Sequence, residues 1–442
     1  MHKSPIRLPF KSITPHIINM TKPNGFSFIR IWLSIIFSVL LISAGFGQTN
    51  NQPYSIHAIG DITENTINRT TGLASTGIAY RNNRYLINNN PASLSALDNS
   101  YFIGEIGVNG EYIDYTGVPV SQTNHQSSDI TFKRFAMGTK IFKHWGSSLG
   151  LIPYSEENYE YSGFRDIGGS GGLIPTYNQG YGGINKVFWA NGFQVSPHFS
   201  VGLTTSFLFG TIDNKNIIFG QGTSIYLSKN NSTYFNNIYL DYGMQYFAPI
   251  NSHWDIGFGA TFSNQQNLRT ETTVTILNLD SNVLSSKSSI GTYSIPTNYG
   301  IGITITKDKK YTFLADYKYQ NWSSLRASTG DFTYQNSQRA SVGFEMSKKK
   351  VAYNTLYETN FFQAGFYYNK TYLIVNGTSI DDIGGSVGFG ANSKRSPLSF
   401  IFVVSYGIKG TAYNNLIREN YMNFSFVFSF RDFWYTQGRK FE

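Results

Sequence analysis

The pattern of hydrophobic and polar positions in most of this chain has a period of two. From Tyr101 to Phe430, one segment after another alternates an apolar residue with a small or polar one. Successive side chains of a strand point to opposite faces, so this alternation predicts strands with one apolar side and one polar side. The clearest segments are 198–210, 253–262, 298–306, 311–319, 339–346, 383–391 and 422–430.

The connections between these segments alternate in length, which distinguishes two architectures that share the pattern. A soluble β-sandwich would show the same alternation, but it has no reason to alternate short and long connections. An outer-membrane barrel has short periplasmic turns, longer outer loops and an even number of strands. The short connections are 143–146, 196–198, 249–252, 307–310 and 393–397, with a somewhat longer one at 347–360; the long ones are 116–128, 163–177, 212–232, 270–294, 324–335, 372–380 and 410–417. Counting between them gives about fourteen strands, an even number that suits a barrel.

The last predicted strand supports closure of that barrel. Its apolar face carries Met422, Phe424, Phe426, Phe428 and Phe430, and its polar face carries Asn423, Ser425 and Ser429. A free sheet edge is unfavourable in lipid, so the last strand has to pair with the first. The sequence therefore predicts an all-β fold, a transmembrane antiparallel β-barrel over 99–431 closed by this strand, with a periplasmic tail over 432–442.

A segment before the barrel, 72–98, has neither strand nor helix periodicity and is rich in Ala, Gly, Ser and Asn. Backbone outside strands is tolerated at membrane depth only where protein or a water-filled lumen surrounds it. We therefore expect residues 48–98 to form an arm and a plug inside the barrel. An ordinary N-terminal loop region has the same composition and stays open as an alternative.

Composition supports a membrane barrel more than a soluble enzyme. Aromatic residues make up 16% of the 442 residues and charged residues only 14%, whereas globular chains carry about 25% charged residues. The mean hydropathy is nevertheless −0.24, as expected for strands with one apolar and one wet face. The chain has no cysteine, which excludes disulfides, a thiol nucleophile and cysteine-bound metals.

The N-terminal residues 1–47 are predicted to be a signal peptide. They carry five basic residues and no acid, so the formal charge of +9 falls to 9 − 5 = +4 without them. The apolar run 31–46 follows the basic region, and the small residues after it place the mature start at Gln48. A membrane-anchoring helix is the competing interpretation, and Met20 is an alternative initiator. Because basic and aromatic residues do not form an interleaved run, we expect no nucleic-acid partner.

Chemical motifs are few, and we expect neither an enzyme nor a cofactor. Residues 146–150 fit the G-x-S-x-G pattern around Ser148, but that motif needs a strand–turn–helix context. A surface lipase is therefore only the enzyme alternative. The glycine cluster 168–172 is predicted to be a flexible outer loop, and Asp280, Asp381 and Asp382 are placed in outer loops, where a divalent ion is an open alternative. His57, His125, His144, His198 and His253 lie singly, without metal-ligand spacing.

Several motifs together resemble the outer-membrane transport family of long-chain fatty-acid and hydrocarbon channels (FadL/TodX-like), in the form common in Bacteroidetes. The stretches that carry the resemblance are Thr76-Gly77-Ile78-Ala79 and Asn90-Pro91-Ala92-Ser93 in 72–98, ADYKYQNWSS at 315–324, Tyr367-Tyr368-Asn369-Lys370 and Ile380-Asp381-Asp382 in 365–390, and the segments 410–421 and 432–435. They cover nearly the whole mature chain in the same order.

The resemblance implies a fourteen-strand barrel in the cell outer membrane that takes up a hydrophobic small molecule. It also implies a plug that gates passage and a lateral release through a gap in the wall; the plug or gate residues would be Gly72, Gly77, Asn90, Pro91, Ala92 and Ser93, with 90–97 rearranging to open the path. Expected partners are the ligand, outer-membrane lipid and the barrel-assembly machinery. The plug motif ends as NPAS and the segment is rich in Asn, which leaves the ligand open. The alternative function is a scaffold or shuttle component of a type IX-like secretion system, because a fold does not determine a role.

Overall fold

The computed structural model describes residues 51–64, 66–99, 101–120, 125–166, 173–219, 225–278, 280–325, 332–352, 355–393 and 397–433. The chain divides into two units, 1–47 and 48–442. The predicted signal peptide, the glycine cluster 168–172 and most of the predicted tail lie outside the described residues. In the part of the chain that is described, no helix is long and apolar enough to cross a membrane.

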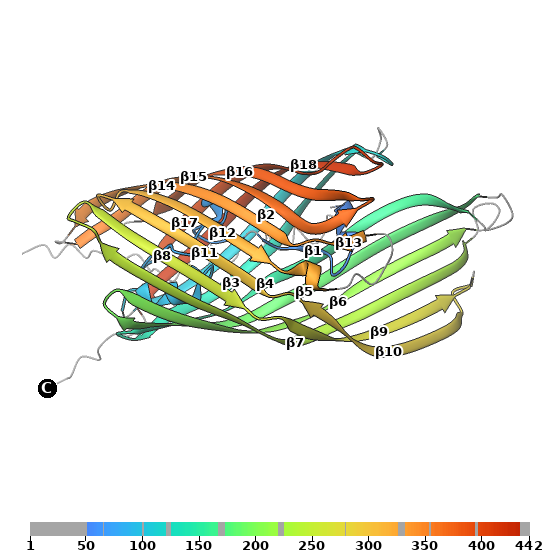
Figure 1. Cartoon of the computed structure of the whole chain (residues 1–442), viewed down its shortest axis with the longest axis horizontal. Coiled ribbons are helices and arrows are strands. Elements are labelled where there is room, and N and C mark those ends of the chain that lie inside the picture. Colours follow the sequence, from blue (N-terminus) through green and yellow to red (C-terminus); the bar gives the residue numbers. More distant parts are fainter. Residues whose placement is uncertain are drawn as a thin grey trace, which may run out of the picture. The chain divides into compact units, whose positions relative to one another are not determined.

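Strands make up nearly all of the second unit (Figure 1). They are β1 Asp61–Ile62, β2 Tyr101–Gly117, β3 Gln126–Phe142, β4 Trp145–Asp166, β5 Leu173–Ser196, β6 Phe199–Phe219, β7 Ile225–Pro249, β8 Trp254–Ser263, β9 Gln266–Leu277, β10 Val283–Ile295, β11 Asn298–Lys307, β12 Tyr311–Gln320, β13 Phe332–Tyr334, β14 Ser337–Ala352, β15 Thr355–Val375, β16 Thr378–Asn392, β17 Leu398–Gly410 and β18 Ile417–Phe433. Four short 3-10 helices accompany them: η1 Pro53–Ile56, η2 Thr71–Leu73, η3 Pro91–Ala96 and η4 Trp322–Ser324.

The strands form one closed antiparallel barrel, as predicted. β18 pairs with β2 along its whole length, from Ile417 opposite Gly117 to Phe433 opposite Tyr101. β8 and β9 both pair with β7 and are two parts of one wall strand; β10 and β11 form the next wall strand, and β13 extends β14. The wall therefore has fourteen strands, and the final aromatic strand closes it.

The outer surface of the barrel is apolar. Phe424, Phe426, Phe428 and Phe430 on β18 are 37–45% exposed, while Ser425 on the opposite face is 2% exposed. Most of the long strands carry similar exposed apolar side chains, an arrangement that is unfavourable in water and favourable against lipid. β8, β11 and β12 are each ten residues long, which matches a tilted strand crossing a bilayer. This barrel fits an outer membrane.

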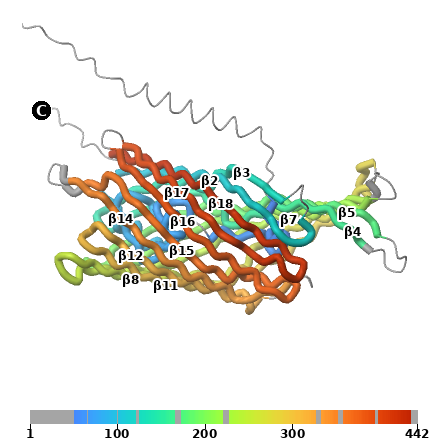
Figure 2. The backbone as a smooth tube through the Cα atoms, turned by 90° about the horizontal axis from the view of Figure 1, so that it is seen from above, coloured from blue at the N-terminus to red at the C-terminus, as the bar shows by residue number. Residues whose placement is uncertain are grey.

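Residues 51–98, which we call the inner segment, lie within the barrel (blue in Figures 1 and 2). η3 packs against β4, β5, β6 and β7, and η2 packs against β14, β15, β16 and β17. Glycines on the wall permit this close approach: a Cβ at Gly202 would lie 2.4 Å from the backbone of Pro91 and Ala92. The small residues in the wall and in the inner segment are therefore complementary.

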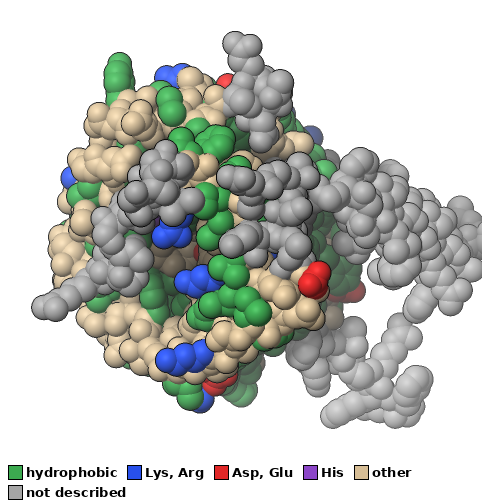
Figure 3. Space-filling model, turned by 90° about the vertical axis from the view of Figure 1, so that its right-hand side faces the viewer, with side chains coloured by type: hydrophobic (Ala, Val, Ile, Leu, Met, Phe, Trp, Pro, Cys, Tyr) green, Lys and Arg blue, Asp and Glu red, His purple; other side chains and the backbone are tan. Residues whose placement is uncertain are grey.

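The predicted long loops 163–177, 212–232, 270–294 and 372–380 are wrong over most of their length, because the strands continue through them, whereas 116–128 and 410–417 contain the predicted connections. β6 and β7 extend to Phe219 and from Ile225, and β9 and β10 occupy most of 270–294. The ends of β4, β5, β6, β7, β9 and β10 together form a sheet that projects at the end opposite the short turns (right in Figures 1 and 2); we call it the outer sheet. Figure 3 views the barrel from that end, where hydrophobic, basic and some acidic side chains lie among uncharged ones.

Candidate functional site

The predicted plug residues lie where the inner segment meets the wall. The backbone N–H groups of Gly77 and Ile78 donate to one carboxylate oxygen of Asp316 on β12, at 2.6 and 2.9 Å. Gly72 lies against Gln363 and Gly388, where a Cβ would be 2.5 Å from the Gln363 side-chain oxygen. Both glycines therefore stand at positions of close approach to the wall.

Asn90 joins the inner segment to two wall strands. Its Nδ2 donates to the carbonyls of Ile78 at 2.9 Å, of Met244 on β7 at 3.0 Å and of Ala260 on β8 at 3.3 Å. Its Oδ1 accepts from the N–H of Ala92 at 3.1 Å and caps η3. Pro91 follows as the first residue of η3, a position that suits proline because no helical partner is needed for its nitrogen. Ser93 donates to the Ile87 carbonyl at 2.6 Å.

A buried ionic cluster that the sequence analysis missed anchors the inner segment. Arg69 Nη1 lies 2.7 Å from Glu358 of β15 and Nη2 lies 2.8 Å from Glu345 of β14. Tyr80 donates to Glu345 at 2.8 Å, and Gln363 donates to Glu345 at 2.7 Å and to the Arg69 carbonyl at 2.8 Å. Burial alone would lower the pKa of Arg69, but the two carboxylates raise it well above its usual value, so the guanidinium stays charged.

A second buried pair fixes the other side of the inner segment. Arg134 on β3 lies 3.1 Å from Glu105 on β2. Arg134 also donates to the Leu86 carbonyl at 2.9 Å and to Asn88 Oδ1 at 2.6 Å, and Glu105 accepts from the Leu86 N–H at 2.8 Å. Both ionic groups are almost fully buried. No spacing in the sequence indicates either cluster, since the partners come from distant strands.

The wall loses its pairing between β3 and β4. The two strands pair only from Phe135 opposite Leu151 to Phe142 opposite Trp145. A bulge at Lys133 shifts β3 against β2 just beyond this point. The remaining part of β3 and residues 152–166 of β4 have no described pairing with each other; we call this interval the β3–β4 opening.

The start of the inner segment covers the β4 edge of this opening. Asp61 and Ile62 of β1 pair with Glu156 and Ser155 of β4. The N–H groups of Gln52 and Thr63 donate to β4 carbonyls, at 2.7 and 3.0 Å. Lys133 and Glu156 form an ion pair across the opening. The arm, residues 51–63, thus takes the place that β3 leaves on β4.

Two cavities inside the barrel meet at Lys133. One, of about 200 Å³, is lined by Ile67, Ile152, Phe188 and Tyr239 among others, together with Lys133, Lys186 and Asp241. The other, of about 160 Å³, also reaches Lys133 and is lined mainly by polar residues, including Glu111, Asp382 and Glu419. The inner side of the opening is therefore mixed, with apolar and charged walls.

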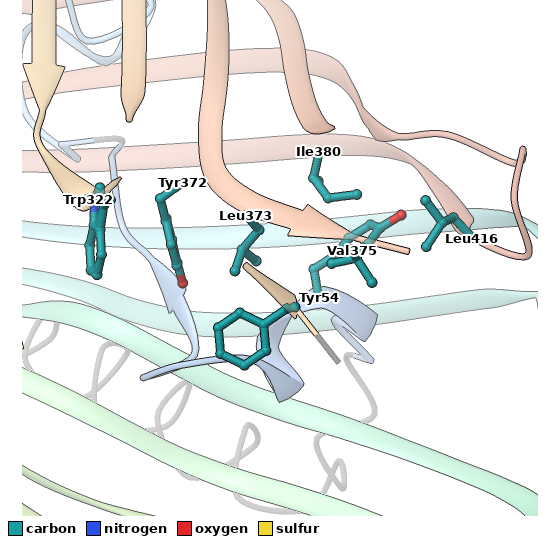
Figure 4. Packing of buried hydrophobic residues seen from close by; sticks show 8 residues of the cluster. Tyr54, Trp322, Tyr372, Leu373, Val375, Ile380 and Leu416 are labelled. Carbon is teal, nitrogen blue, oxygen red and sulfur yellow. The ribbon is translucent and has the colours of Figure 1, made fainter. Parts of the chain in front are cut away.

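An apolar cluster holds the start of the arm. It includes Tyr54 of η1, Trp322 and the end of β15; Tyr54 lies near Val375, and Trp322 lies beside Tyr372 (Figure 4). The other members are Phe332, Tyr372, Leu373, Val375, Ile380 and Leu416. Trp322 and Tyr372 stack at 4.4 Å between ring centroids. The arm is thus held at one end by this cluster and along its length by β4.

Comparison with models of protein families shows to which family the chain belongs. The family model BamG matches residues 29–442. The chain belongs to the BamG family.

Solved structures show the same fold for this BamG-family chain. A Pseudomonas aeruginosa FadL homologue superposes with a TM-score of 0.59 at 14% identity, covering 85% of this chain and 100% of the other. The Ralstonia pickettii toluene transporter TbuX superposes with a TM-score of 0.53 at 13% identity, covering 83% of this chain and 98% of the other. The Pseudomonas putida toluene transporter TodX superposes with a TM-score of 0.52 at 11% identity, covering 85% of this chain and 100% of the other. The search of curated proteins found no match. The predicted likeness to FadL and TodX is confirmed for the fold, while the family itself has another name; the Bacteroidetes form stays a prediction.

The remaining chemical candidates find little support in this BamG-family structure. β4 runs continuously through Ser148, which is 1% exposed, so the strand–turn–helix context of a nucleophile elbow is absent there. The placement of Asp381 and Asp382 in an outer loop is wrong: both lie on β16, and Asp382 accepts from the Tyr367 and Tyr421 hydroxyls inside the barrel. No group of three His, Asp or Glu among the described residues is arranged to hold a metal.

Proposed function

We propose that this chain is an outer-membrane channel for hydrophobic small molecules, which leave sideways through the β3–β4 opening rather than through the inner segment. The structures with this fold include two toluene transporters, which supports transport over catalysis. The observation that carries the lateral route is the loss of pairing between β3 and β4.

The depth of the opening agrees with release into the bilayer. The paired part of β3 comprises residues 135–142, and tilted strands of this length rise roughly 20 Å, less than the hydrocarbon core of about 30 Å. The unpaired part of β3 therefore begins at membrane depth. Ile130 and Phe132 on this part are 67% and 50% exposed, which suits contact with acyl chains.

In this proposal the gate is the arm, and the rest of the inner segment is a fixed seal. Moving 90–97 would break the Asn90 hydrogen bonds to β7 and β8, and moving 66–80 would break the buried Arg69 cluster. The arm is attached to β4 by a two-residue ladder and a few backbone hydrogen bonds, and elsewhere by the Tyr54 cluster and an ion pair between Asp61 and Lys409. Displacing it exposes the opening and leaves the buried Arg69 and Arg134 ion pairs of the seal in place.

A disulfide across the arm and β4 tests this gate. Ile62 and Ser155 are register partners, and the Cα spacing of such partners suits a disulfide. Because the chain has no cysteine, Ile62→Cys with Ser155→Cys introduces a single bridge. We expect toluene uptake into cells to stop under oxidising conditions and to return with a reductant.

The matched control joins the same two wall strands where they already pair. Thr139 and Ser147 are register partners on β3 and β4, so Thr139→Cys with Ser147→Cys leaves the opening free and uptake unchanged in either redox state. If the Ile62→Cys, Ser155→Cys variant takes up toluene equally well when oxidised and when reduced, the arm is not the gate.

A scaffold role is the second candidate, and the free edge of the outer sheet favours it. β10 pairs with β9 along one edge, and none of the described strands pairs with its other edge. Free edges accept extended segments of other proteins, and the family name BamG suggests an association with barrel assembly. A protein that purifies in stoichiometric amounts with the chain and cross-links to Ser288→Cys on β10, but not to Ser232→Cys on the central strand β7, would favour the scaffold.

A further inference from the structure

A large cavity opens at the short-turn end of the barrel, which is the periplasmic end in outer-membrane barrels. Its volume is about 960 Å³. Residues 79–84 of the inner segment form its inner wall, and the ends of β7, β8, β12, β14, β15 and β18 surround it. This cavity lies on the far side of the seal from the β3–β4 opening and has no part in the proposed lateral route.

Arg81 faces this cavity, and none of the described carboxylates forms an ion pair with it. Its Nη1 donates to Gln245 at 3.1 Å and to Ser200 at 3.3 Å, and its Nη2 donates to Ser95 at 3.1 Å. Its guanidinium carbon lies 3.9 Å from the centre of the Phe247 ring. All these partners are neutral, and burial lowers the pKa of Arg81 to about 10.

Arg84 faces the same cavity and likewise forms no ion pair with a carboxylate in the part of the chain that the structure describes. It lies 4.8 Å from the centre of the Tyr357 ring, and its Nε is buried with no hydrogen-bond acceptor among the described residues. A third cation in the lining, Lys349, donates to the backbone carbonyl of Lys309. The wall therefore offers donors and positive charge without anionic partners.

The acidic residues of the lining do not neutralise these two arginines. Glu345 and Glu358 are paired with Arg69, and Asp98 is paired with Arg431. Asp255 and Asp432 also line the cavity, but no ion pair joins either of them to Arg81 or Arg84 in the described part of the chain. The counter-charge for the arginine pair is missing from the described wall.

Charged groups taken out of water are unfavourable unless an opposite charge or a full set of hydrogen bonds compensates them. The charge of a guanidinium group is compensated best by a carboxylate or a phosphate, which it binds through two parallel hydrogen bonds. We propose that Arg81 and Arg84 form a binding site for an oxyanion, a carboxylate or a phosphate, presented from the periplasmic end of the barrel. The aromatic rings of Phe247 and Tyr357 hold the two guanidinium groups over the cavity.

An acidic peptide segment and free phosphate carry the same chemistry, and a binding experiment separates them. The mature chain in detergent micelles is titrated into a fluorescein-labelled tetraglutamate peptide, followed by anisotropy, and inorganic phosphate is then added as competitor. Peptide binding that inorganic phosphate displaces only weakly would assign the site to an acidic peptide segment. Binding of phosphate alone, seen by calorimetry and lost in the arginine variant, would assign the site to the free ion.

Two variants give the decisive comparison. Arg81→Gln with Arg84→Gln should weaken anion binding by at least about tenfold per lost charge-assisted contact. Lys348→Gln with Lys350→Gln removes the same charge from exposed positions at the same end and outside the cavity lining, and should change binding by less than about twofold. Equal losses in both variants, or no binding of either probe to the wild-type chain, would overturn the site.

A single substitution keeps the test valid if the double variant fails to fold. The side chain of Arg84 makes a ring contact but no hydrogen bond to the described part of the wall, so Arg84→Gln removes a cation without releasing the inner segment. It should still weaken binding several-fold, and unchanged binding in this variant would also count against the proposal.

Discussion

Arg69→Met is the sharpest test of the claim that the inner segment is a fixed seal. The substitution keeps a long side chain but removes the cation that is ion-paired with both Glu345 and Glu358, which are 3% and 7% exposed. Removing one partner of a buried ion pair costs about 3–5 kcal/mol. Because Tyr80, Gln363 and Ser347 still donate to the two carboxylates, we expect a value within that range rather than above it. The equilibrium constant between the inner segment bound in the barrel and the inner segment displaced from it should then shift about a thousandfold toward the displaced state.

The assay is the conductance of the purified barrel in planar bilayers, with guanidinium unfolding measured in parallel. Arg69→Met should show openings to small ions that the wild-type chain does not show, and deletion of 72–98 should set the upper limit of the leak. Adding Glu345→Gln and Glu358→Gln removes the unpaired charges and should restore part of the closure. Lys348→Met on β14, the strand of Glu345, serves as control, since Lys348 is exposed and forms no ion pair with any described residue. Closed channels and an unchanged unfolding midpoint in Arg69→Met would refute the reasoning.

Three further predictions follow from the same structure. Gly202→Ala should lower the free energy of unfolding by about 1–3 kcal/mol, because the added Cβ overpacks against Ala92. The measurement is the denaturation midpoint. The control Gly104→Ala, where a Cβ has room, should change that midpoint little. Phe426→Arg places a cation on the lipid face and should cost about 2–4 kcal/mol of folding free energy in vesicles; a loss below measurement error would contradict a lipid-facing β18. Since burial lowers the pKa of Arg81 to about 10, anion binding at the Arg81–Arg84 cavity should be constant near neutral pH and fall as the pH rises through that value; a fall between pH values of about 6 and 8, where an arginine keeps its charge, would indicate a different group.

The alternation of residue types determined the strand architecture because it follows from local geometry. Each strand exposes one face to lipid and the other to the lumen, so Phe424, Phe426 and Phe428 alternate with small polar residues whatever the partner strand is. The count of about fourteen strands followed from the same local signal. The strand ends did not, because the residues of the outer sheet alternate only weakly; β6, β7, β9 and β10 therefore continue through segments predicted to be loops.

Only the tertiary structure decided how the interior is held and where the wall opens. Arg69 and Glu358 are separated by 289 residues, and they meet because closing the barrel brings β14 and β15 to the inner segment. The bulge at Lys133 and the ladder between Ile62 and Ser155 likewise depend on which strand lies beside which. Period and composition reflect the solvent on each face of a strand, whereas ion pairs, openings and unpaired arginines reflect the three-dimensional neighbours that chain closure selects.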